Sequence, residues 1–240
     1  MKFEQFYSSS KGNLYQVTTN NGKRLLIECG VPWRLLQKAL DYNLGGIEGV
    51  LCSHEHNDHS KAIKDILKAG INIYASLGTI DSLGISGHRK VNVLESTRTF
   101  SSSATLRMDF QVYAFNLNHD SAEPLGFVIK CDNEYLLYAC DTAFIKQRFK
   151  IPFNIIAIEC SYDKEILQER LDTGKINEEL AKRLLNCHME KQTAIKYLKE
   201  FCDLSRCSEI HLLHMSENTT DKEKTRQEIE DKFFVKTIIK

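Results

Sequence analysis

The sequence predicts an α/β protein whose helices pack outside its β-sheets. Short apolar runs occur first as paired, strand-like segments and later alternate with segments of helical periodicity, an order typical of this class. The chain has 240 residues, only three prolines and no Gly/Ser-rich linker, so we expect a single domain spanning residues 1–240. A chain of this length buries a core without disulfide or metal staples.

The first half of the chain begins with a predicted hairpin. Tyr15–Thr18 and Arg24–Glu28 are expected to be strands, because Asn20-Asn21-Gly22 between them is a strong turn signal. The segments that follow predict, in order, a helix over Trp33–Leu40, a buried strand at Gly49–Cys52, a helix capped by Ser60 with Ala62, Ile63, Ile66 and Leu67 inside, and a strand at Ile71–Ala75.

The second half of the chain alternates strands and helices. Its predicted elements are two strands within Thr105–Leu117, a hairpin of Gly126–Cys131 and Tyr135–Ala139, a buried strand at Ile155–Glu159, helices near Asn177–Leu185 and Glu190–Phe201, a core strand at Ile210–Leu213, a polar helix at Asp221–Lys232 and a closing strand at Phe233–Ile239. His54, His119, Asp141 and His214 each come just after a predicted strand. Loops at strand ends of a rigid sheet are a common place for a metal site.

Composition restricts the partners of the protein. Lys and Arg number 32, and so do Asp and Glu, so the formal net charge is zero and bulk charge alone would not hold nucleic acid. No apolar run approaches the roughly 20 residues that span a bilayer, and Met1–Ser10 lacks the apolar core of a signal peptide. We therefore expect a cytoplasmic protein without a membrane partner. Its eight scattered cysteines, with no Cys-x-x-Cys pair, predict free thiols.

The chemistry is concentrated in the motif His54-x-His56-x-Asp58-His59. Imidazole suits zinc, iron, nickel and copper, and carboxylate also admits manganese. Four such groups exceed what one open catalytic ion requires, so the motif predicts two ions. Ions about 3.5–4 Å apart stabilise both the attacking and the leaving oxygens of a displacement. Two nearby cations repel, so a carboxylate must bridge them. Asp141 is the candidate, and His119 and His214 could complete the two shells.

This ordered set of motifs resembles that of the metallo-β-lactamase superfamily, which has His-x-His-x-Asp-His, a later His, an Asp and a final His. The similarity is greatest to the WalJ/YycJ-like branch, which is related to the tRNase Z nucleases, and it covers nearly the whole chain. The matching stretches are Ser8–Asn13, Leu25–Gly30, His54–His59, Asn118–Pro124, Cys140–Thr142, Glu159–Asp163, Cys187–Met189 and Leu213–Ser216.

The resemblance implies a four-layer αββα sandwich with metals at one edge. It implies two divalent ions, zinc or manganese, and a bridging hydroxide that attacks phosphorus. The implied ligands are His54, His56 and His119 for the first ion, Asp58, His59 and His214 for the second, and Asp141 as the bridge. Asp58, Asp141 and His188 are the expected catalytic residues.

The substrate contacts are expected outside the metal ligands. In the resembled branch a histidine at the position of His188 faces the substrate, where it binds phosphate or protonates the leaving oxygen; the alternative is an exposed interhelix residue. Ser9, Lys11 and Asn13 lie in a polar loop whose backbone amides are candidates for cradling an anion. The cations Lys146, Arg148 and Lys150 are interpreted as a solvated strip in preference to a phosphate-facing rim.

Three departures from the branch concern the surroundings of the metals. Glu28 stands where many relatives have Asp, Ser8-Ser9-Ser10 where many have Ser-Gly-Ser, and His188-Met189-Glu190-Lys191 where many have His-x-Ser-Asn. The last two lie near the expected phosphate pocket and affect the choice of substrate.

We therefore predict a dinuclear-metal-dependent phosphodiesterase, exonuclease-like, that acts on single-stranded DNA or RNA. One alternative substrate is a small nucleotide such as a cyclic nucleotide, and a thiolester or lactam is another. A non-catalytic metal-binding member of the fold is the alternative from a different class. The expected partners are a nucleic acid or nucleotide substrate and, in a homodimer, a second copy of the chain.

Overall fold

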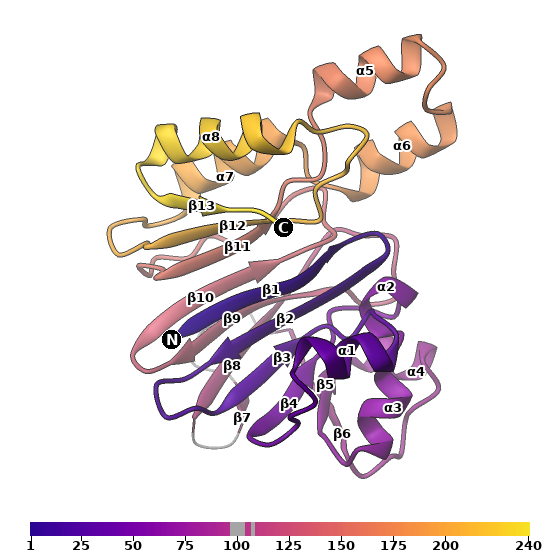
Figure 1. Ribbon diagram of the computed structural model, residues 1–240, viewed down its shortest axis with the longest axis vertical. Helices are drawn as coiled ribbons and strands as arrows, with labels where there is room; N and C mark the ends of the chain where they lie inside the picture. The colour runs from indigo at the N-terminus through magenta and orange to yellow at the C-terminus, as the bar shows by residue number, and fades with distance from the viewer. Residues whose placement is uncertain (97–103, 107–108) are drawn as a thin grey trace. The chain divides into compact units, whose positions relative to one another are not determined.

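The computed structural model describes residues 1–96, 104–106 and 109–240 (Figure 1). The chain divides into two compact units, the first made of residues 1–116 and 121–134, the second of residues 117–120 and 135–240. The expectation of one domain stays a prediction. In the described residues the strands belong to two sheets, one of six strands and one of seven.

The six-stranded sheet lies entirely in the first unit. Its strands follow chain order: β1 (Lys2–Ser9), β2 (Gly12–Thr18), β3 (Arg24–Ile27), β4 (Ile47–Leu51), β5 (Ile73–Ala75) and β6 (Val91–Val93). The first three pair antiparallel, and β3 to β6 pair parallel. The predicted hairpin of β2 and β3 is confirmed, with Gly22 at a positive φ of 81° in the turn.

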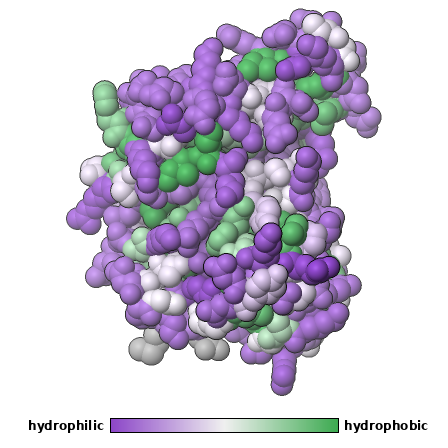
Figure 2. Space-filling view, viewed as in Figure 1, coloured by the Kyte–Doolittle hydropathy of each residue, from purple (hydrophilic) through white to green (hydrophobic). Residues whose placement is uncertain are grey.

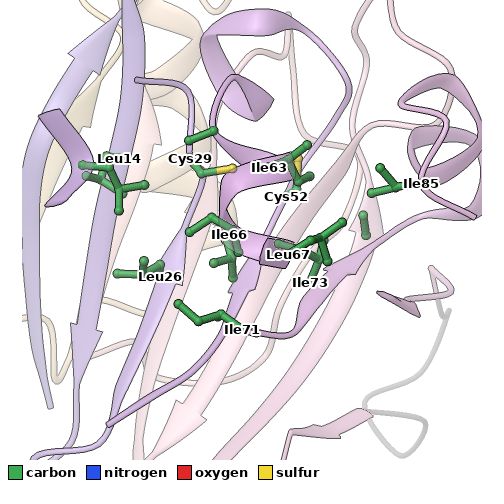
Figure 3. Packing of buried hydrophobic residues seen from close by; sticks show 14 of the residues in the cluster. Leu14, Leu26, Cys29, Cys52, Ile63, Ile66, Leu67, Ile71, Ile73 and Ile85 are labelled. Atoms are coloured by element: carbon green, nitrogen blue, oxygen red, sulfur yellow. The ribbon is translucent and has the colours of Figure 1, made fainter. Parts of the chain in front are cut away.

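Four short helices connect the parallel strands of this sheet. They are α1 (Trp33–Ala39), α2 (Asn57–Ser60), α3 (Ile63–Lys68) and α4 (Leu77–Ser82). Apolar side chains from α3, including Ile63, Ile66 and Leu67, gather with those of β2 to β5 in one buried cluster (Figure 3). This packing holds the sheet and its helices together. It therefore fixes the end of β4, where the loop to α2 begins.

The first unit also carries three antiparallel strands. These are β7 (Ala104–Leu106), β8 (Phe110–Asn116) and β9 (Leu125–Cys131). Residues 107–108, within the segment predicted to hold two strands, lie outside the described residues. The turn after β9 has Asp132 and Asn133 at φ values of 53° and 61°, the left-handed conformation that a type I′ hairpin turn requires.

The second unit contains the parallel part of the seven-stranded sheet. Its strands β10 (Glu134–Ala139), β11 (Ile155–Glu159), β12 (Glu209–Leu213) and β13 (Lys236–Ile238) pair in that order, all parallel. The helices are α5 (Lys164–Asp172), α6 (Glu178–Cys187), α7 (Lys191–Phe201) and α8 (Lys222–Phe233). In Figure 1, α7 and α8 run along β11 to β13.

Side chains cap each of these four helices. Asp163, Asn177, Glu190 and Asp221 each accept a hydrogen bond from a backbone N–H of the first turn that follows. One predicted cap is wrong. Ser60 ends α2, and its hydroxyl donates to the carbonyls of Glu55 and His56, whereas α3 begins after Ala62 without a side-chain cap.

The visible surface is polar, and the cysteines are free, as their spacing in the sequence predicts. The face seen in Figure 2 is mainly hydrophilic, with apolar side chains in scattered groups. All eight cysteines are free thiols, and six of them are buried. Within the described residues, no helix is both long and apolar enough to cross a membrane.

Candidate metal centre

The first motif occupies the loop after β4 and the short helix α2. His54 Nε2 lies 3.1 Å from His56 Nδ1. His59 Nε2 lies 3.5 Å from Asp58 Oδ2, and the ring centroids of His54 and His59 are 4.1 Å apart. Six consecutive residues therefore bring three imidazoles and one carboxylate together within the first unit, as their spacing predicts.

Buried polar groups orient two of these histidines. Glu28, which is fully buried, places Oε1 3.4 Å from His59 Nδ1, and its Oε2 accepts a hydrogen bond of 3.2 Å from the Ser53 N–H. The Ser53 hydroxyl lies 2.9 Å from His54 Nδ1. Groups bound at Nδ1 fix the orientation of an imidazole ring. These contacts hold the His54 and His59 rings in fixed orientations.

Close backbone packing holds the same loop against β2 and β3. A Cβ built on Gly30 would lie 1.6 Å from the Asp58 carbonyl oxygen, so only glycine fits there. The Cys29 N–H donates to the His59 carbonyl at 2.9 Å. The side-chain amide of Asn13 donates to the Asp58 carbonyl at 3.2 Å and lies 3.1 Å from His59 Nε2. Asn13 is fully buried, and these two contacts join it to the loop of the first motif.

The other two predicted substrate contacts of the first unit lie at the turn between β1 and β2. The Ser9 hydroxyl accepts a hydrogen bond of 3.2 Å from the Lys11 N–H, and Lys11 is exposed. This geometry leaves the Lys11 ammonium in solvent. The anion-binding role of Ser9, Lys11 and Asn13 stays a prediction.

In the second unit, one carboxylate lies between two histidines. Asp141 follows β10, His214 follows β12, and His119 lies in the short segment 117–120. Asp141 Oδ2 is 3.6 Å from His119 Nε2, and Asp141 Oδ1 is 3.7 Å from His214 Nε2. The two oxygens of a single carboxylate thus face different imidazoles, which is the arrangement that a bridging ligand requires.

Asp141 and His214 share an uncommon backbone conformation. Their φ values are 54° and 52°, in the left-handed region that non-glycine residues rarely adopt. Each follows a core strand closely, Asp141 two residues after β10 and His214 directly after β12. Such strain costs about 1–3 kcal/mol per residue and clusters at functional sites.

The structure adds Glu159 to the site, which the sequence-based prediction missed. Glu159 ends β11 and is fully buried, with Oε1 2.6 Å from His188 Nδ1 and 3.8 Å from His214 Nδ1. Its Oε2 accepts a hydrogen bond of 2.7 Å from the Thr142 N–H. Donor atoms of Asp141, Glu159, His188 and His214 all lie within 4.8 Å of one another. The signal available in the sequence was one acidic residue closing an otherwise apolar strand.

His188 lies among the other imidazoles of the second unit and is buried, where the alternative interpretation expected an exposed residue. Its ring stacks on His214 with centroids 5.2 Å apart and meets the edge of His119 at 5.5 Å. Burial lowers the pKa of His188, but the Glu159 carboxylate outweighs this and raises it to about 9. The Glu159 carboxylate therefore favours the protonated form of His188 in the metal-free protein.

His119 differs from His188 in its hydrogen-bond partner and in the direction of its pKa shift. Its Nδ1 donates to the Cys187 carbonyl at 3.2 Å, which fixes the ring and leaves Nε2 toward Asp141. Burial lowers the pKa of His119, and the nearby carboxylates only partly offset this, so its neutral form is favoured. A neutral imidazole with its Nδ1 bound to a carbonyl is the form that binds a divalent metal. Histidine nitrogens and aspartate oxygens together fit zinc or manganese.

Comparison with known proteins identifies the family. The β-lactamase superfamily domain matches residues 23–201 of this chain. This chain belongs to the metallo-β-lactamase superfamily. The exodeoxyribonuclease YycJ of Bacillus anthracis is 25% identical to it in an alignment 240 residues long that covers 95% of this chain and 88% of that protein. The chain is therefore a hydrolase of this superfamily, with a His/Asp cluster that could bind metal.

Solved structures show the same fold. The metallo-β-lactamase fold protein YhfI of Bacillus subtilis has a TM-score of 0.74 at 16% identity, with 99% of this chain and 95% of that chain covered. The short form of human tRNase Z has a TM-score of 0.62 at 17% identity, covering 90% and 93%. The predicted αββα sandwich is confirmed as the fold class.

Proposed function

We propose that this superfamily hydrolase is a dinuclear-metal-dependent phosphodiesterase that removes nucleotides from the end of single-stranded nucleic acid. The observation that carries the proposal is the Asp141 carboxylate, whose two oxygens face His119 and His214. The likeness to a relative named as an exodeoxyribonuclease supports the choice of a phosphodiester substrate.

The ligand assignment follows the superfamily pattern. We assign His54, His56 and His119 to one ion, Asp58, His59 and His214 to the other, and Asp141 to both. The donor chemistry of these residues fits zinc or manganese. When bound, such ions lower the pKa of water and neutralise charge on phosphoryl oxygens.

The residues of the chain itself supply the remaining steps. Glu159 accepts the Nδ1–H of His188 and orients the ring, and we propose that Nε2–H binds a phosphoryl oxygen or protonates the leaving oxygen. Glu28 and Ser53 keep His59 and His54 in fixed orientations. Ser9 and Lys11 are our candidates for contact with the substrate phosphate.

Metal content and hydrolysis of bis-p-nitrophenyl phosphate test the proposal together. We expect the wild-type protein to bind two equivalents of zinc or manganese and to hydrolyse this diester. Asp58→Ala, His59→Ala and Asp141→Asn should each abolish most of the rate, and Asp141→Asn should also lower the metal content. Asp172→Asn, an exposed carboxylate on α5, is the matched control. Full activity and metal content in Asp141→Asn would contradict the assignment.

The role of His188 has its own test. His188→Ala should slow cleavage of an oligonucleotide more than cleavage of the activated diester, because a general acid matters most for a poor leaving group. Equal losses on both substrates would remove His188 from the proton-transfer step.

A small cyclic nucleotide is the second candidate substrate. It is favoured by the zero net charge of the chain and by the departures from the branch pattern near His188. A side-by-side assay on single-stranded DNA, single-stranded RNA and cyclic nucleotides, with manganese and with zinc, separates the two.

Homodimer formation and a cytoplasmic location stay predictions. Light scattering on purified protein tests the formation of a homodimer.

A further inference from the structure

We propose that Phe144, Lys146, Arg148 and Lys150, here called the basic strip, form a track that binds a single-stranded polynucleotide next to the metal centre. This inference rests on the proposed function and specifies its substrate class. It also replaces the interpretation of these cations as an ordinary solvated strip.

The four side chains share one side of their segment. Phe144, Lys146, Arg148 and Lys150 are exposed, while Ile145 and Phe149 between them are buried. Alternation of exposed and buried residues is the pattern of an extended chain lying on a core. One aromatic ring and three cations therefore face solvent in a row.

The near end of the strip is tied to the candidate metal centre. Thr142 follows Asp141 directly, and its N–H donates to Glu159. The Thr142 hydroxyl accepts from the Asn118 N–H at 2.9 Å and donates to the Phe144 carbonyl at 2.8 Å. Asn118 precedes His119. One buried threonine thus fixes the start of the strip relative to three residues of the centre.

The far end is held down by α7 and by the core. The Tyr197 hydroxyl donates to the Gln147 carbonyl at 2.9 Å. The Arg148 guanidinium lies 4.3 Å from the centroid of the Phe201 ring, which holds this cation in place. Phe149 packs edge-on against Phe153 with ring centroids 5.7 Å apart. The cations are therefore displayed on an anchored backbone, which lowers the entropy lost on binding.

The charge of the strip is not neutralised locally. Residues 142–153 contain no Asp or Glu, although the whole chain has equal numbers of acidic and basic residues. Within the described part of the chain, no carboxylate forms an ion pair with Lys146, Arg148 or Lys150. Three unneutralised cations in a row match a polyanion better than they match a single phosphate.

An exposed phenylalanine completes the match to a nucleic acid strand. Phe144 is 40% exposed, and Lys146 Nζ lies 5.7 Å from its ring centroid. Proteins that bind single strands combine cations along the backbone with aromatic side chains on which bases stack. A cyclic nucleotide has one phosphate and cannot reach three cations, so the strip favours an oligonucleotide.

Binding of a hydrolysis-resistant strand tests the strip. The probe is a fluorescent phosphorothioate oligothymidylate, titrated by anisotropy into the manganese-loaded protein over a range of salt. The variants are the triple Lys146→Gln/Arg148→Gln/Lys150→Gln and the single Phe144→Ala. The control triple Lys182→Gln/Lys224→Gln/Lys232→Gln removes the same charge from exposed positions on α6 and α8. Circular dichroism verifies folding, and Lys146→Gln alone replaces the triple if the triple unfolds.

We expect the strip triple to bind about tenfold more weakly or worse and to lower the slope of log K against log salt by about 2, at roughly 0.7 per phosphate contact. Phe144→Ala should bind roughly tenfold more weakly, with little change of slope. The control triple should match wild type. The strip triple should also lose more kcat/KM on an oligonucleotide than on bis-p-nitrophenyl phosphate.

Equal affinity and slope in the strip triple and the control triple would overturn the inference, as would tight binding of anionic lipid vesicles but not of the oligothymidylate. Failure of the proposed function looks different, because the wild-type protein would then not hydrolyse bis-p-nitrophenyl phosphate. Hydrolysis of the small diester with no effect of the strip would leave the proposed function standing and remove the track alone.

Discussion

Glu159 Oε1 lies 2.6 Å from His188 Nδ1, and the same carboxylate accepts the Thr142 N–H through its other oxygen. Glu159 is fully buried and ends β11, a strand of the second unit. One side chain therefore connects the imidazole at the end of α6 with the backbone beyond Asp141. Loss of either hydrogen bond leaves a buried donor without its partner.

Glu159→Gln is expected to destabilise the metal-free protein. The glutamine oxygen can still accept from the Thr142 N–H, but its NH2 group then faces His188 Nδ1 and cannot accept from the protonated ring, so the charge-assisted hydrogen bond is lost. A hydrogen bond to a charged group contributes about 1.5–3 kcal/mol. Urea unfolding in the presence of a chelator measures this, with Glu169→Gln on the exposed side of α5 as the control. Similar unfolding free energies for the two variants would contradict the assigned role.

Gly30→Ala is expected to displace the loop of the first motif. The new methyl group would overlap the Asp58 carbonyl, which is backbone and cannot rotate away. Overpacking of this kind costs about 1–3 kcal/mol or more. Gly45→Ala is the comparison, since its nearest contact is the Asn43 side-chain oxygen at 3.1 Å. The melting temperature of each variant gives the answer, and an unchanged value for Gly30→Ala would show that the loop can shift freely.

Metal removal is expected to lower the melting temperature. A ligand that binds only the folded state stabilises it by about 2.7 kcal/mol when present at roughly 100 times its dissociation constant. Differential scanning calorimetry before and after chelation should therefore show a shift that zinc or manganese restores. His214→Ala should show a smaller shift on restoration. Identical curves for chelated and metal-loaded wild type would speak against a metal centre.

His211 is expected to make stability depend on pH. Burial lowers the pKa of His211, and Glu209, with Oε2 3.1 Å from its Nε2, offsets only part of this. The unfolded chain then binds the proton more readily than the folded one. The stability that results is present above the unfolded pKa of about 6.5 and is lost as the pH falls below it.

Chemical unfolding from about pH 7 to about pH 5.5 checks this dependence. Wild type should lose more stability over that interval than His211→Gln, which does not titrate. Ionisable groups other than His211 contribute equally to both curves, so the informative quantity is the difference between the two proteins. Parallel curves would show that His211 contributes nothing.

The sequence predicts strands and helices well where one face is apolar. The helix predicted from Glu190 to Phe201 is α7, with Glu190 as its cap, and the helix predicted from Asp221 to Lys232 is α8, capped by Asp221. In contrast α5 (Lys164–Asp172) was missed, because Leu167 is its only buried residue and its apolar periodicity is weak.

The part of the site that was predicted from the sequence is the part that residue type and position after a strand reveal. His54, His119, Asp141 and His214 follow strands, and that much is visible in the sequence. The partnership of Glu159 with His188 joins residues 29 positions apart in sequence, which no local pattern reveals. The basic strip was visible as a run of charge, but which side chains face solvent depends on tertiary contacts such as the one between Tyr197 and Gln147.

Selection for heat resistance alone would drive this protein away from catalysis. Asp141 and His214 hold left-handed backbone angles that glycine adopts freely and that other residues adopt at a cost of about 1–3 kcal/mol. A mutant library screened only for survival at high temperature, with a chelator present so that metal binding adds no stability, is therefore expected to enrich glycine at both positions, although each such change removes a proposed metal ligand. Positions that keep their residue in clones selected for activity would be those that hydrolysis requires even at a cost in stability.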